Sequence, residues 1–264
     1  MSLTVTNKSE IDDFEESVRK SKIILLDIEG TITSISYVKD TLFSFIRRNL
    51  DCYLKAHWKD SDLDNDLLLL REQANEDKRN GIPGVVIIPE YNESNEKDLL
   101  EAAKKNVIWQ MDLDRKTKAL KQFQGHVMHE GYKQGKLKGH IYPDVLPALK
   151  SWVKNGKKVY IYSSGSIEAQ KLLFGHSEEG DILEYFSGHF DTEVGPKVES
   201  NSYFNIMKRL NCESDKIVFF TDVPKEAEAA NGAGIKTILV VREGNSPLTE
   251  EDKKSFSTIR TFKL

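Results

Sequence analysis

The stretch Lys22-Ile23-Ile24-Leu25-Leu26-Asp27-Ile28-Glu29-Gly30-Thr31 carries the clearest fold signal in this chain. Its apolar run of β-branched residues and leucines ends at an acid and a glycine, which is the pattern of a strand buried on both faces. The same pattern recurs later, at residues 158–162, 216–220 and 236–241. Helix-like stretches separate the last three runs, at residues 168–174, 203–210 and 225–232. Alternating buried strands and helices predict an α/β fold with a parallel, doubly wound (Rossmann-like) sheet.

The sequence changes character between residues 33 and 140. Long, charged, helix-like stretches replace the apolar runs there, at residues 38–57, 62–79, 97–105 and 117–133. We therefore expect a mainly helical domain over residues 33–140, inserted after the first strand of a discontinuous α/β core that comprises residues 1–32 and 141–264. The polar, glycine-containing segment 134–140 is typical of a hinge.

The composition is that of a globular protein with no general affinity for polyanions. The 264 residues include 38 Lys and Arg against 42 Asp and Glu, a formal net charge of −4, which argues against a nucleic-acid or membrane partner. Residues 1–20 lack a basic region followed by an apolar one, and the apolar runs at 23–26 and 67–70 are far shorter than the roughly 20 residues of a membrane span. Cys52 and Cys212 lack metal-ligand spacing. We expect a cytoplasmic protein, with the nucleus as a second location.

Polar side chains follow three of the predicted strands at the point where each strand ends. They are Asp27, Ser163 and Asp222. In a doubly wound sheet, ligands bind at the carboxyl ends of the strands, so three separate segments bring these side chains to one edge. Asp27 and Glu29 stand two positions apart on an extended turn, and Asp222 adds a third carboxylate. A cluster of oxygen ligands of this kind is typical of a site for a hard ion such as Mg²⁺.

The segment Ser163-Ser164-Gly165-Ser166 follows the second strand and precedes a helix. Hydroxyls and free backbone N–H groups at such a junction form a phosphate site, although the same residue types also serve as ordinary helix caps. The segment is neither a GxSxG nucleophile elbow nor a P-loop. Lys197 lies in a turn before a later helix and could add a positive charge, but a lone lysine is more often solvated. His126 and His129 stand at helical i, i+3 spacing, and we assign no metal to them because no third ligand is evident.

Taken in order, these elements resemble the four motifs of the haloacid dehalogenase superfamily of phosphotransferases. The motifs are a strand-end Asp27-Ile28-Glu29-Gly30-Thr31, a strand-end serine, a lysine before a helix, and a strand-end aspartate followed four residues later by Glu226. The segments at 162–175, 188–192, 219–223 and 240–245, with Ile108-Trp109-Gln110 in the insertion, are similar to one branch of that superfamily. This branch is the enolase-phosphatases (acireductone synthases) of methionine salvage, and the resemblance covers residues from about 23 to 249.

The resemblance implies a sheet of the haloacid dehalogenase type, with the helical insertion acting as a cap over the strand ends. It also implies that Asp27 is the nucleophile, and that Glu29 is the general acid and base. One Mg²⁺ per chain would be held by the Asp27 carboxylate, the Glu29 main-chain carbonyl and Asp222. The remaining implied roles are phosphate contacts at Ser163, Ser164 and Lys197, and orientation of that lysine or of metal-bound water by Glu226.

The activity implied by this branch has two steps on one small phosphorylated diketone. The substrate would be 2,3-diketo-5-methylthiopentyl-1-phosphate, which is enolised and then dephosphorylated to 1,2-dihydroxy-3-keto-5-methylthiopentene. An acid at Glu29 favours phosphate-ester hydrolysis because it can protonate the leaving oxygen and then activate water. The base for enolisation stays open, with Glu29 as a candidate. Two alternatives remain, a phosphatase of another small metabolite and a non-catalytic scaffold. We expect a monomer, since a cap within one chain can close the site alone.

Overall fold

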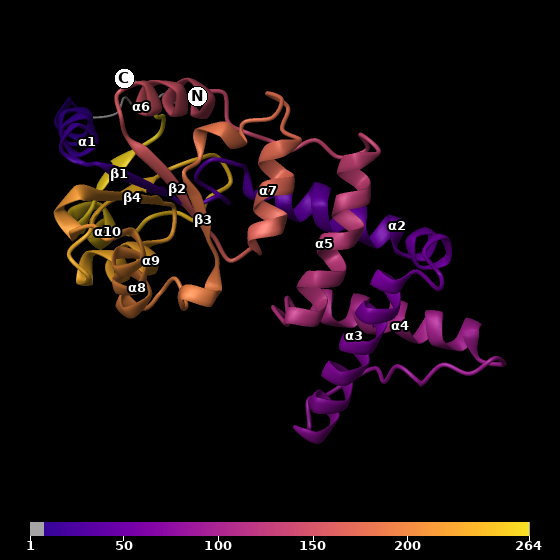
Figure 1. The fold of residues 1–264 in the computed structure, drawn as a ribbon. Helices are drawn as coiled ribbons and strands as arrows, with labels where there is room; N and C mark the ends of the chain where they lie inside the picture. The colour runs from indigo at the N-terminus through magenta and orange to yellow at the C-terminus, as the bar shows by residue number, and fades with distance from the viewer. Residues whose placement is uncertain (1–7, 264) are drawn as a thin grey trace. The chain divides into compact units, whose positions relative to one another are not determined.

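The computed structural model describes residues 8–263 (Figure 1). Met1–Asn7 and Leu264 lie outside the described residues, so the expectation drawn from residues 1–20 falls partly outside them. The described residues divide into two compact units, the first made of those before and after the range 40–137 and the second of residues 40–137. Within residues 8–263, every helix is too short or too polar to cross a membrane.

The first unit is built on a six-stranded sheet with the strand order β3-β2-β1-β4-β5-β6. Every neighbouring pair is parallel. The strands are β1 (Ile23–Leu26), β2 (Lys158–Tyr162), β3 (Gly188–Phe190), β4 (Ile217–Thr221), β5 (Lys236–Val240) and β6 (Ser257–Ile259). The chain fills one side of β1 first and then the other, which confirms the predicted doubly wound α/β sheet. The strand order reverses between β1 and β4, which is where ligands bind in sheets of this kind.

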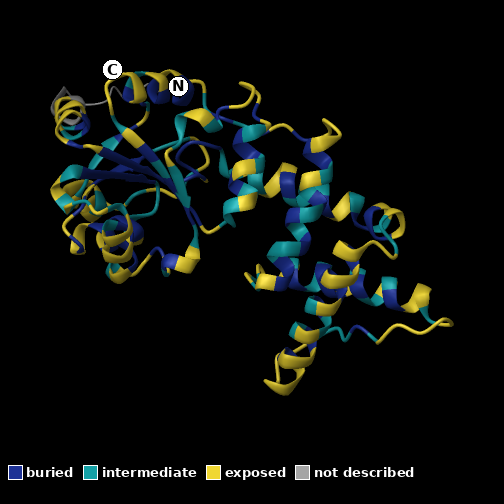
Figure 2. Cartoon of the chain, in the orientation of Figure 1, coloured by how far each residue is buried: buried dark blue, intermediate teal, exposed yellow. Residues whose placement is uncertain are grey.

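The central strands are buried on both faces, as their continuous apolar runs predicted (Figure 2). All four residues of β1 and all five of β4 are buried. Leu26 pairs with Ile161 of β2 on one side and with Phe220 of β4 on the other. Because these residues stand level in the sheet, the segments that leave β1, β2 and β4 start at the same edge.

Helices cover both faces of this sheet. Phe14 and Trp152 both pack on Phe220, with ring centroids 5.7 and 6.1 Å away, whereas Tyr203 packs on Phe219 at 5.5 Å. Adjacent residues of a strand point to opposite faces, so the helices that carry these rings lie on opposite sides. The first two rings belong to α1 (Lys8–Lys20) and α6 (Val145–Lys154), and Tyr203 belongs to α8 (Ser200–Leu210). The other helices of the unit are α7 (Ile167–Gly175), α9 (Pro224–Gly232) and α10 (Glu250–Ser255).

The second unit is helical and has its own apolar core. A π-helical turn over Tyr37–Leu42 leads into α2 (Phe43–Ala56), which is followed by α3 (Ser61–Arg79), α4 (Glu96–Asp112) and α5 (Lys118–Lys133). Helix α4 continues to Asp112, although the sequence predicted an end at residue 105. Buried Asn106 and Gln110 account for the difference, because polar residues on the inner face hide the apolar periodicity. Gln110 donates to Asn106 at 2.7 Å, so both amides find partners inside the unit.

The helical unit comprises residues 40–137, whereas the sequence placed the insertion at 33–140. Residues at the two ends of the predicted range 33–140 are hydrogen-bonded to each other within the α/β unit. The His140 Nδ1 atom accepts a hydrogen bond from the Ser34 N–H at 3.1 Å, and the Thr33 hydroxyl lies 3.1 Å from the same atom. Hydrogen bonds therefore join the two segments that lead into and out of the helical unit.

Candidate active site

Asp27 lies directly after β1 and is 5% exposed. Its Oδ1 atom accepts a hydrogen bond from the Ile28 N–H at 2.7 Å and contacts the Lys197 ammonium at 2.6 Å. The Oδ2 atom has a longer contact of 3.5 Å with the Thr221 hydroxyl at the end of β4. One carboxylate oxygen is therefore held firmly, and the other is more loosely engaged.

Lys197 bridges two buried carboxylates. Its Nζ atom lies 2.6 Å from Asp27 and 2.7 Å from Glu226, and the side chain is 8% exposed. Glu226, in the first turn of α9, also accepts a hydrogen bond from the Thr221 hydroxyl at 2.7 Å. Lys197 is thus part of a buried ion-pair network, whereas the sequence alone favoured a solvated lysine. Glu226 contacts this lysine directly.

The turn that carries Lys197 is fixed through three consecutive carbonyl groups, those of residues 195–197. Each one accepts a hydrogen bond from a different buried side chain: Tyr162 at 2.8 Å, Ser202 at 2.6 Å and Tyr203 at 2.8 Å, respectively. These donors come from β2 and from the first half of α8. The backbone that carries the lysine to the strand ends is therefore rigidly held.

This cluster holds more acidic groups than basic ones, and the excess of negative charge shifts the pKa values of its members. Burial lowers the pKa of Lys197, but the negative charges of Asp27 and Glu226 outweigh burial and raise that pKa above its ordinary value. Burial, together with the Asp27 charge, raises the pKa of Glu226 to about 7, against the lowering effect of Lys197. Asp222 adds a further carboxyl group, so three acids face one lysine. A cation would relieve this excess of negative charge.

Asp222 follows β4 and lies against the turn that contains Gly30. A Cβ atom on Gly30 would fall 2.4 Å from the Asp222 Oδ2 atom, and the glycine has a φ of +76°, so only glycine fits here. Asp222 Oδ1 is buried and has no hydrogen-bond partner within residues 8–263. Burial and the charges of Asp27 and Glu226 raise the pKa of Asp222 to about 7. An unpaired, buried carboxylate oxygen at this position fits a metal ligand.

Glu29 lies on the tight turn between Asp27 and Gly30, and its side chain is exposed. The Ile28 carbonyl accepts hydrogen bonds from three successive N–H groups, those of residues 31–33. The Gly30 and Thr31 carbonyls are held from outside by Asn245 at 3.0 Å and by Arg242 at 3.1 Å. The turn is thus held by hydrogen bonds on both sides of Glu29, whose side chain is exposed.

Ser163 follows β2 and is 8% exposed, whereas Ser164 is exposed. The Ser163 N–H donates to the Phe190 carbonyl at 3.2 Å, and its Oγ atom accepts from the Gly165 N–H at 3.4 Å. Ser166 is the residue that caps α7, because its hydroxyl accepts from the Ala169 N–H at 3.2 Å. The first two serines are therefore not needed as caps, which favours the phosphate-site interpretation of this segment over the capping one.

The six site residues predicted from the sequence thus differ in how closely the structure brings them together. Asp27 and Lys197 are in direct contact, and Asp222 is linked to Asp27 through the Gly30 turn. Ser163 and Ser164 follow the neighbouring strand β2. No role was predicted from the sequence for four further residues, although all of them lie in the segments that carry the family resemblance. They are Thr221, Gln170, Arg242 and Asn245.

His126 and His129, the closely spaced histidine pair, have different surroundings. His126 contacts the fully buried Asp66 at 2.7 Å, and His129 is exposed. Within residues 8–263 there is no group of three His, Cys, Asp or Glu side chains placed to hold a metal ion.

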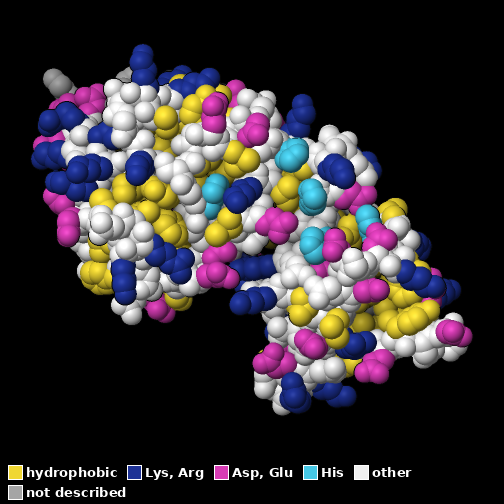
Figure 3. All heavy atoms as spheres, in the orientation of Figure 1, with side chains coloured by type: hydrophobic (Ala, Val, Ile, Leu, Met, Phe, Trp, Pro, Cys, Tyr) yellow, Lys and Arg dark blue, Asp and Glu magenta, His cyan; other side chains and the backbone are white. Residues whose placement is uncertain are grey.

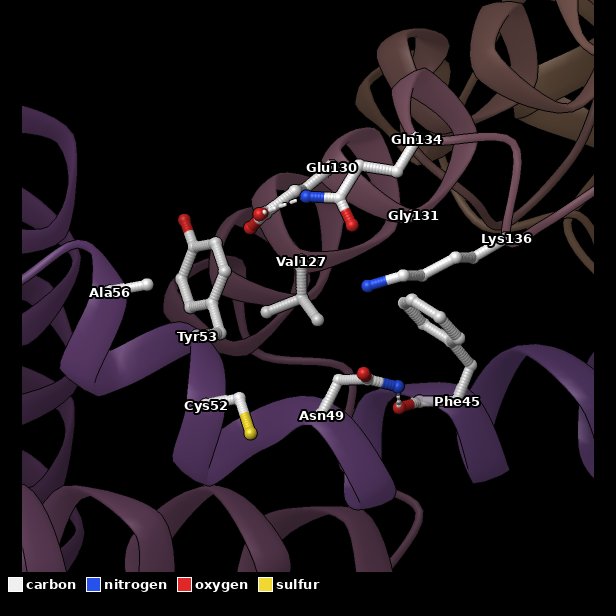
Figure 4. A pocket seen from close by; sticks show the side chains of 10 residues that line it. All are labelled: Phe45, Asn49, Cys52, Tyr53, Ala56, Val127, Glu130, Gly131, Gln134 and Lys136. Carbon is white, nitrogen blue, oxygen red and sulfur yellow. Dashed lines mark hydrogen bonds between the residues drawn. The ribbon is translucent and has the colours of Figure 1, made fainter.

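A separate small pocket lies within the helical unit, between α2 and the end of α5 (Figure 4). Its volume is about 90 Å³, well below the roughly 300–1,000 Å³ of sites for drug-sized ligands. Lys136 and Glu130 face it, and Glu130 is already bonded to His57 at 2.8 Å and to Gln134 at 2.5 Å. Because its carboxylate is occupied and its volume is small, the pocket is a poor candidate for the substrate site.

The surface of both units carries charges of both signs (Figure 3). Lys and Arg side chains are interspersed with Asp and Glu on the face shown there, in keeping with the net charge of −4. This face therefore carries no field of a single sign.

Comparison with known proteins gives a consistent result. A family model described as haloacid dehalogenase-like hydrolase matches residues 21–234. The chain is similar to Enolase-phosphatase E1 of Danio rerio, with 49% identity over 92% of this chain and 93% of the relative. It is 50% identical to Enolase-phosphatase E1 of Anopheles gambiae, over 93% of this chain and 82% of the relative. Among solved structures, the UTR4 protein of Saccharomyces cerevisiae matches with a TM-score of 0.71 and 31% identity, over 91% of this chain and 98% of that one.

Proposed function

This chain belongs to the haloacid dehalogenase-like hydrolases and, within them, to the enolase-phosphatase E1 family, and from that premise we propose that it converts 2,3-diketo-5-methylthiopentyl-1-phosphate to acireductone and inorganic phosphate in methionine salvage. Because it belongs to this family, the chain is a phosphatase. The observation that carries the particular substrate is the identity of about one half with named enolase-phosphatases, which extends over more than nine-tenths of the chain and so includes the helical unit.

In the phosphatase step, Asp27 is the nucleophile. One of its carboxylate oxygens attacks phosphorus, the ester P–O bond breaks, and an aspartyl-phosphate forms. Support comes from the firm anchoring of Oδ1 by the Ile28 N–H and Lys197, which leaves Oδ2 the more loosely held atom. Lys197 also offsets part of the negative charge that a carboxylate and a phosphate bring together.

Glu29 handles the protons of both half-reactions. It donates a proton to the leaving oxygen and later takes one from the water that attacks the aspartyl-phosphate, so the carboxyl group returns to its starting state. Its exposed position on the turn beside Asp27 supports this role, because the side chain can reach a bound substrate. Enolisation also needs a base beside the substrate carbonyl, and Glu29 is the candidate for it.

The residues present fit one Mg²⁺ ion. The donors would be the Asp27 carboxylate, the Glu29 main-chain carbonyl and Asp222, all of them hard oxygen ligands. The buried, unpaired Oδ1 atom of Asp222 and the excess of acids over lysine support the assignment. When bound, the ion supplies positive charge that offsets the phosphoryl group and stabilises an enolate.

The phosphoryl group is bound by Ser163, Ser164 and Lys197. The Ser163 Oγ atom accepts a hydrogen bond from the Gly165 N–H, so its own hydrogen can be donated to a phosphoryl oxygen. The start of α7 adds free N–H groups and the positive end of the helix dipole. We further propose that the helical insertion acts as a cap that excludes water from the reaction, and that the protein works as a monomer.

The proposal is tested by comparing substrates. We expect the Mg²⁺-loaded protein to hydrolyse the diketone phosphate with a kcat/KM at least about tenfold above those of sugar phosphates of similar size. Phosphate release and the appearance of the acireductone chromophore are followed together, and EDTA should stop both. A sugar phosphate turned over as fast as the diketone, or phosphate release without acireductone, would contradict the assignment.

Binding of Mg²⁺ to the metal-free protein is expected to release protons near pH 7. The pKa of Asp222 is about 7, so this carboxyl group is partly protonated there, and a cation can bind only after the proton has left. The affinity for Mg²⁺ should therefore rise with pH through this range and level off above it. Titration calorimetry in two buffers of different ionisation enthalpy measures the number of protons released.

The control for this measurement separates the two acids with raised pKa values. Glu226→Gln removes the second group that titrates near pH 7 but leaves Asp222 in place. Proton release that persists in Glu226→Gln identifies Asp222 as its source. A binding enthalpy that is the same in both buffers would show that no proton leaves, and would contradict Asp222 as a ligand that is protonated in the metal-free protein.

A further inference from the structure

We propose that Gln170 is a positioning residue, which fixes the phosphate-binding turn at residues 163–165, and that His189 in turn fixes Gln170. The inference rests on the proposed function, because that turn is the proposed phosphate site. Neither residue touches the reacting atoms. Their role is to hold the main-chain and side-chain donors of the turn in one orientation.

The Gln170 amide links the turn to the neighbouring edge strand. Gln170 lies on α7 and is 2% exposed. Its Nε2 group donates two hydrogen bonds, to the Gly165 carbonyl at 2.9 Å and to the Phe190 carbonyl at 2.9 Å. The Phe190 carbonyl also accepts from the Ser163 N–H at 3.2 Å. One buried amide therefore connects both ends of the turn to the end of β3.

The orientation of this amide is set by chemistry. If the amide were turned over, its oxygen would face two carbonyl oxygens, and the hydrogen bonds to Gly165 and Phe190 would both be lost. The Oε1 atom therefore points toward His189, whose Nδ1 atom lies 3.0 Å away. An amide oxygen only accepts hydrogen bonds, so His189 carries a hydrogen on Nδ1.

His189 keeps this hydrogen over a wide pH range. Burial lowers the pKa of His189 to about 4, so the ring is neutral at physiological pH with its hydrogen on Nδ1. Its ring lies against Phe174 and Phe186, with centroids 6.2 and 5.8 Å away. Protonation in acid adds a hydrogen to the other nitrogen and leaves the bond to Gln170 in place. All hydrogen-bonding atoms of the Gln170 amide are thus used in a fixed pattern.

This network affects phosphate binding through the peptide group between residues 165 and 166. A trans peptide points its carbonyl and its N–H in opposite directions. Because Gln170 holds the Gly165 carbonyl toward the interior, the N–H of Ser166 points away from Gln170. The same anchoring keeps Gly165 close to Ser163, whose Oγ atom accepts the Gly165 N–H. A loose turn would have to be ordered by the phosphate itself, which weakens binding.

The test measures the binding of inorganic phosphate to the Mg²⁺-loaded protein by titration calorimetry. Gln170→Met keeps the length of the side chain and removes its hydrogen bonds, and we expect the Kd for phosphate to rise about tenfold. With substrate, KM should rise more than kcat falls. The matched control is Gln110→Met, since Gln110 is a fully buried glutamine of the helical unit with two side-chain hydrogen bonds. It should lose similar stability and keep the wild-type Kd.

A second pair of variants tests the role of His189 and covers the case in which Gln170→Met does not fold. His189→Leu removes the donor, and we expect the Kd for phosphate to rise about threefold. His189→Asn places an amide N–H near the former Nδ1 position and should restore most of the affinity. Equal loss in both variants would mean that packing alone matters, and would overturn the role of the hydrogen bond.

Other outcomes separate this inference from the proposed function. Unchanged phosphate binding in Gln170→Met, beside normal binding by the wild type, would overturn the positioning role alone. Equal weakening by Gln170→Met and Gln110→Met would overturn it as well, since a general loss of stability would then explain both. A wild-type protein that binds no phosphate would overturn both proposals. Dependence of phosphate binding on Gln170 in a protein that fails to turn over the diketone supports the inference and counts only against the substrate.

Discussion

Asp27→Asn is expected to release phosphate at least about 10³-fold more slowly than the wild type, because the amide cannot act as a nucleophile toward phosphorus. The measurement is phosphate release under single-turnover conditions with Mg²⁺ present, at a protein concentration above that of the substrate. The substitution removes one charge and changes the side-chain volume very little. Any large loss of activity therefore reports on chemistry rather than on packing.

The fold should survive this substitution. The Asn oxygen can still accept hydrogen bonds from the Ile28 N–H and from Lys197, which keeps Glu226 as a partner. The lost negative charge was one cause of the raised pKa values of Asp222 and Glu226, so both pKa values should fall in the variant. Thermal unfolding within a few degrees of the wild type would verify that the site, and not the fold, has changed.

The control for this variant is Asp215→Asn, which changes an exposed aspartate of the same unit whose partner is the neighbouring Lys216. It should keep wild-type activity. Retention of more than a small fraction of activity by Asp27→Asn would rule out Asp27 as the nucleophile. Loss of activity accompanied by global unfolding would point to a structural role, and the Asn side chain would then have failed to replace the hydrogen bonds of Asp27.

The strands that could be predicted from the sequence are those buried on both faces. β1, β2, β4 and β5 each consist mainly of consecutive apolar residues, because both of their faces meet helices. β3 and β6 were missed, since each has three residues and includes polar or glycine positions. An edge strand of this kind is specified by its neighbour and not by its own composition. The strand-end location of Asp27, Ser163 and Asp222 followed from the first group alone.

The contacts that complete the site could not be predicted from local patterns. Lys197 stands far from Asp27 in the chain, and its burial depends on the carbonyl anchors of its turn, which come from β2 and α8. Gln170 resembles a polar residue on a helix surface, yet it is 2% exposed. The positive φ of Gly30 gains its meaning only from the Asp222 carboxylate that lies against it. Each of these features depends on a second segment brought close by the fold.

Lys197→Met is expected to lower the free energy of unfolding by about 3–5 kcal/mol at pH 8, because it leaves Asp27 and Glu226 buried without their cation. Phosphate release should fall to background at the same time. The measurement is urea unfolding of the metal-free protein, monitored by circular dichroism. The matched control is Lys236→Met, whose partner is Asp13 at 2.8 Å and whose side chain is 46% exposed. An exposed pair of this kind contributes about 1 kcal/mol or less.

The pH dependence of the Lys197→Met deficit identifies its cause. Lys197 lowers the pKa of both Glu226 and Asp222, so its removal raises these pKa values further above those of the unfolded chain. A carboxyl group whose pKa is raised by folding costs no stability below its unfolded pKa, and the cost grows as the pH rises toward the folded pKa. The deficit should therefore be largest above pH 7 and should shrink as the pH falls toward 5, where the folded protein takes up protons.

The double variant Lys197→Met/Glu226→Gln separates charge repulsion from lost packing. If repulsion between buried carboxylates dominates, removing the Glu226 charge should restore part of the stability lost in Lys197→Met, although a second native contact has been deleted. The Gln side chain can still accept the hydrogen bond of the Thr221 hydroxyl. If the double variant is instead less stable than Lys197→Met by the full cost of Glu226→Gln alone, the two effects are additive and the residues do not interact. Such additivity would contradict the ion-pair network on which the assignment of Lys197 depends.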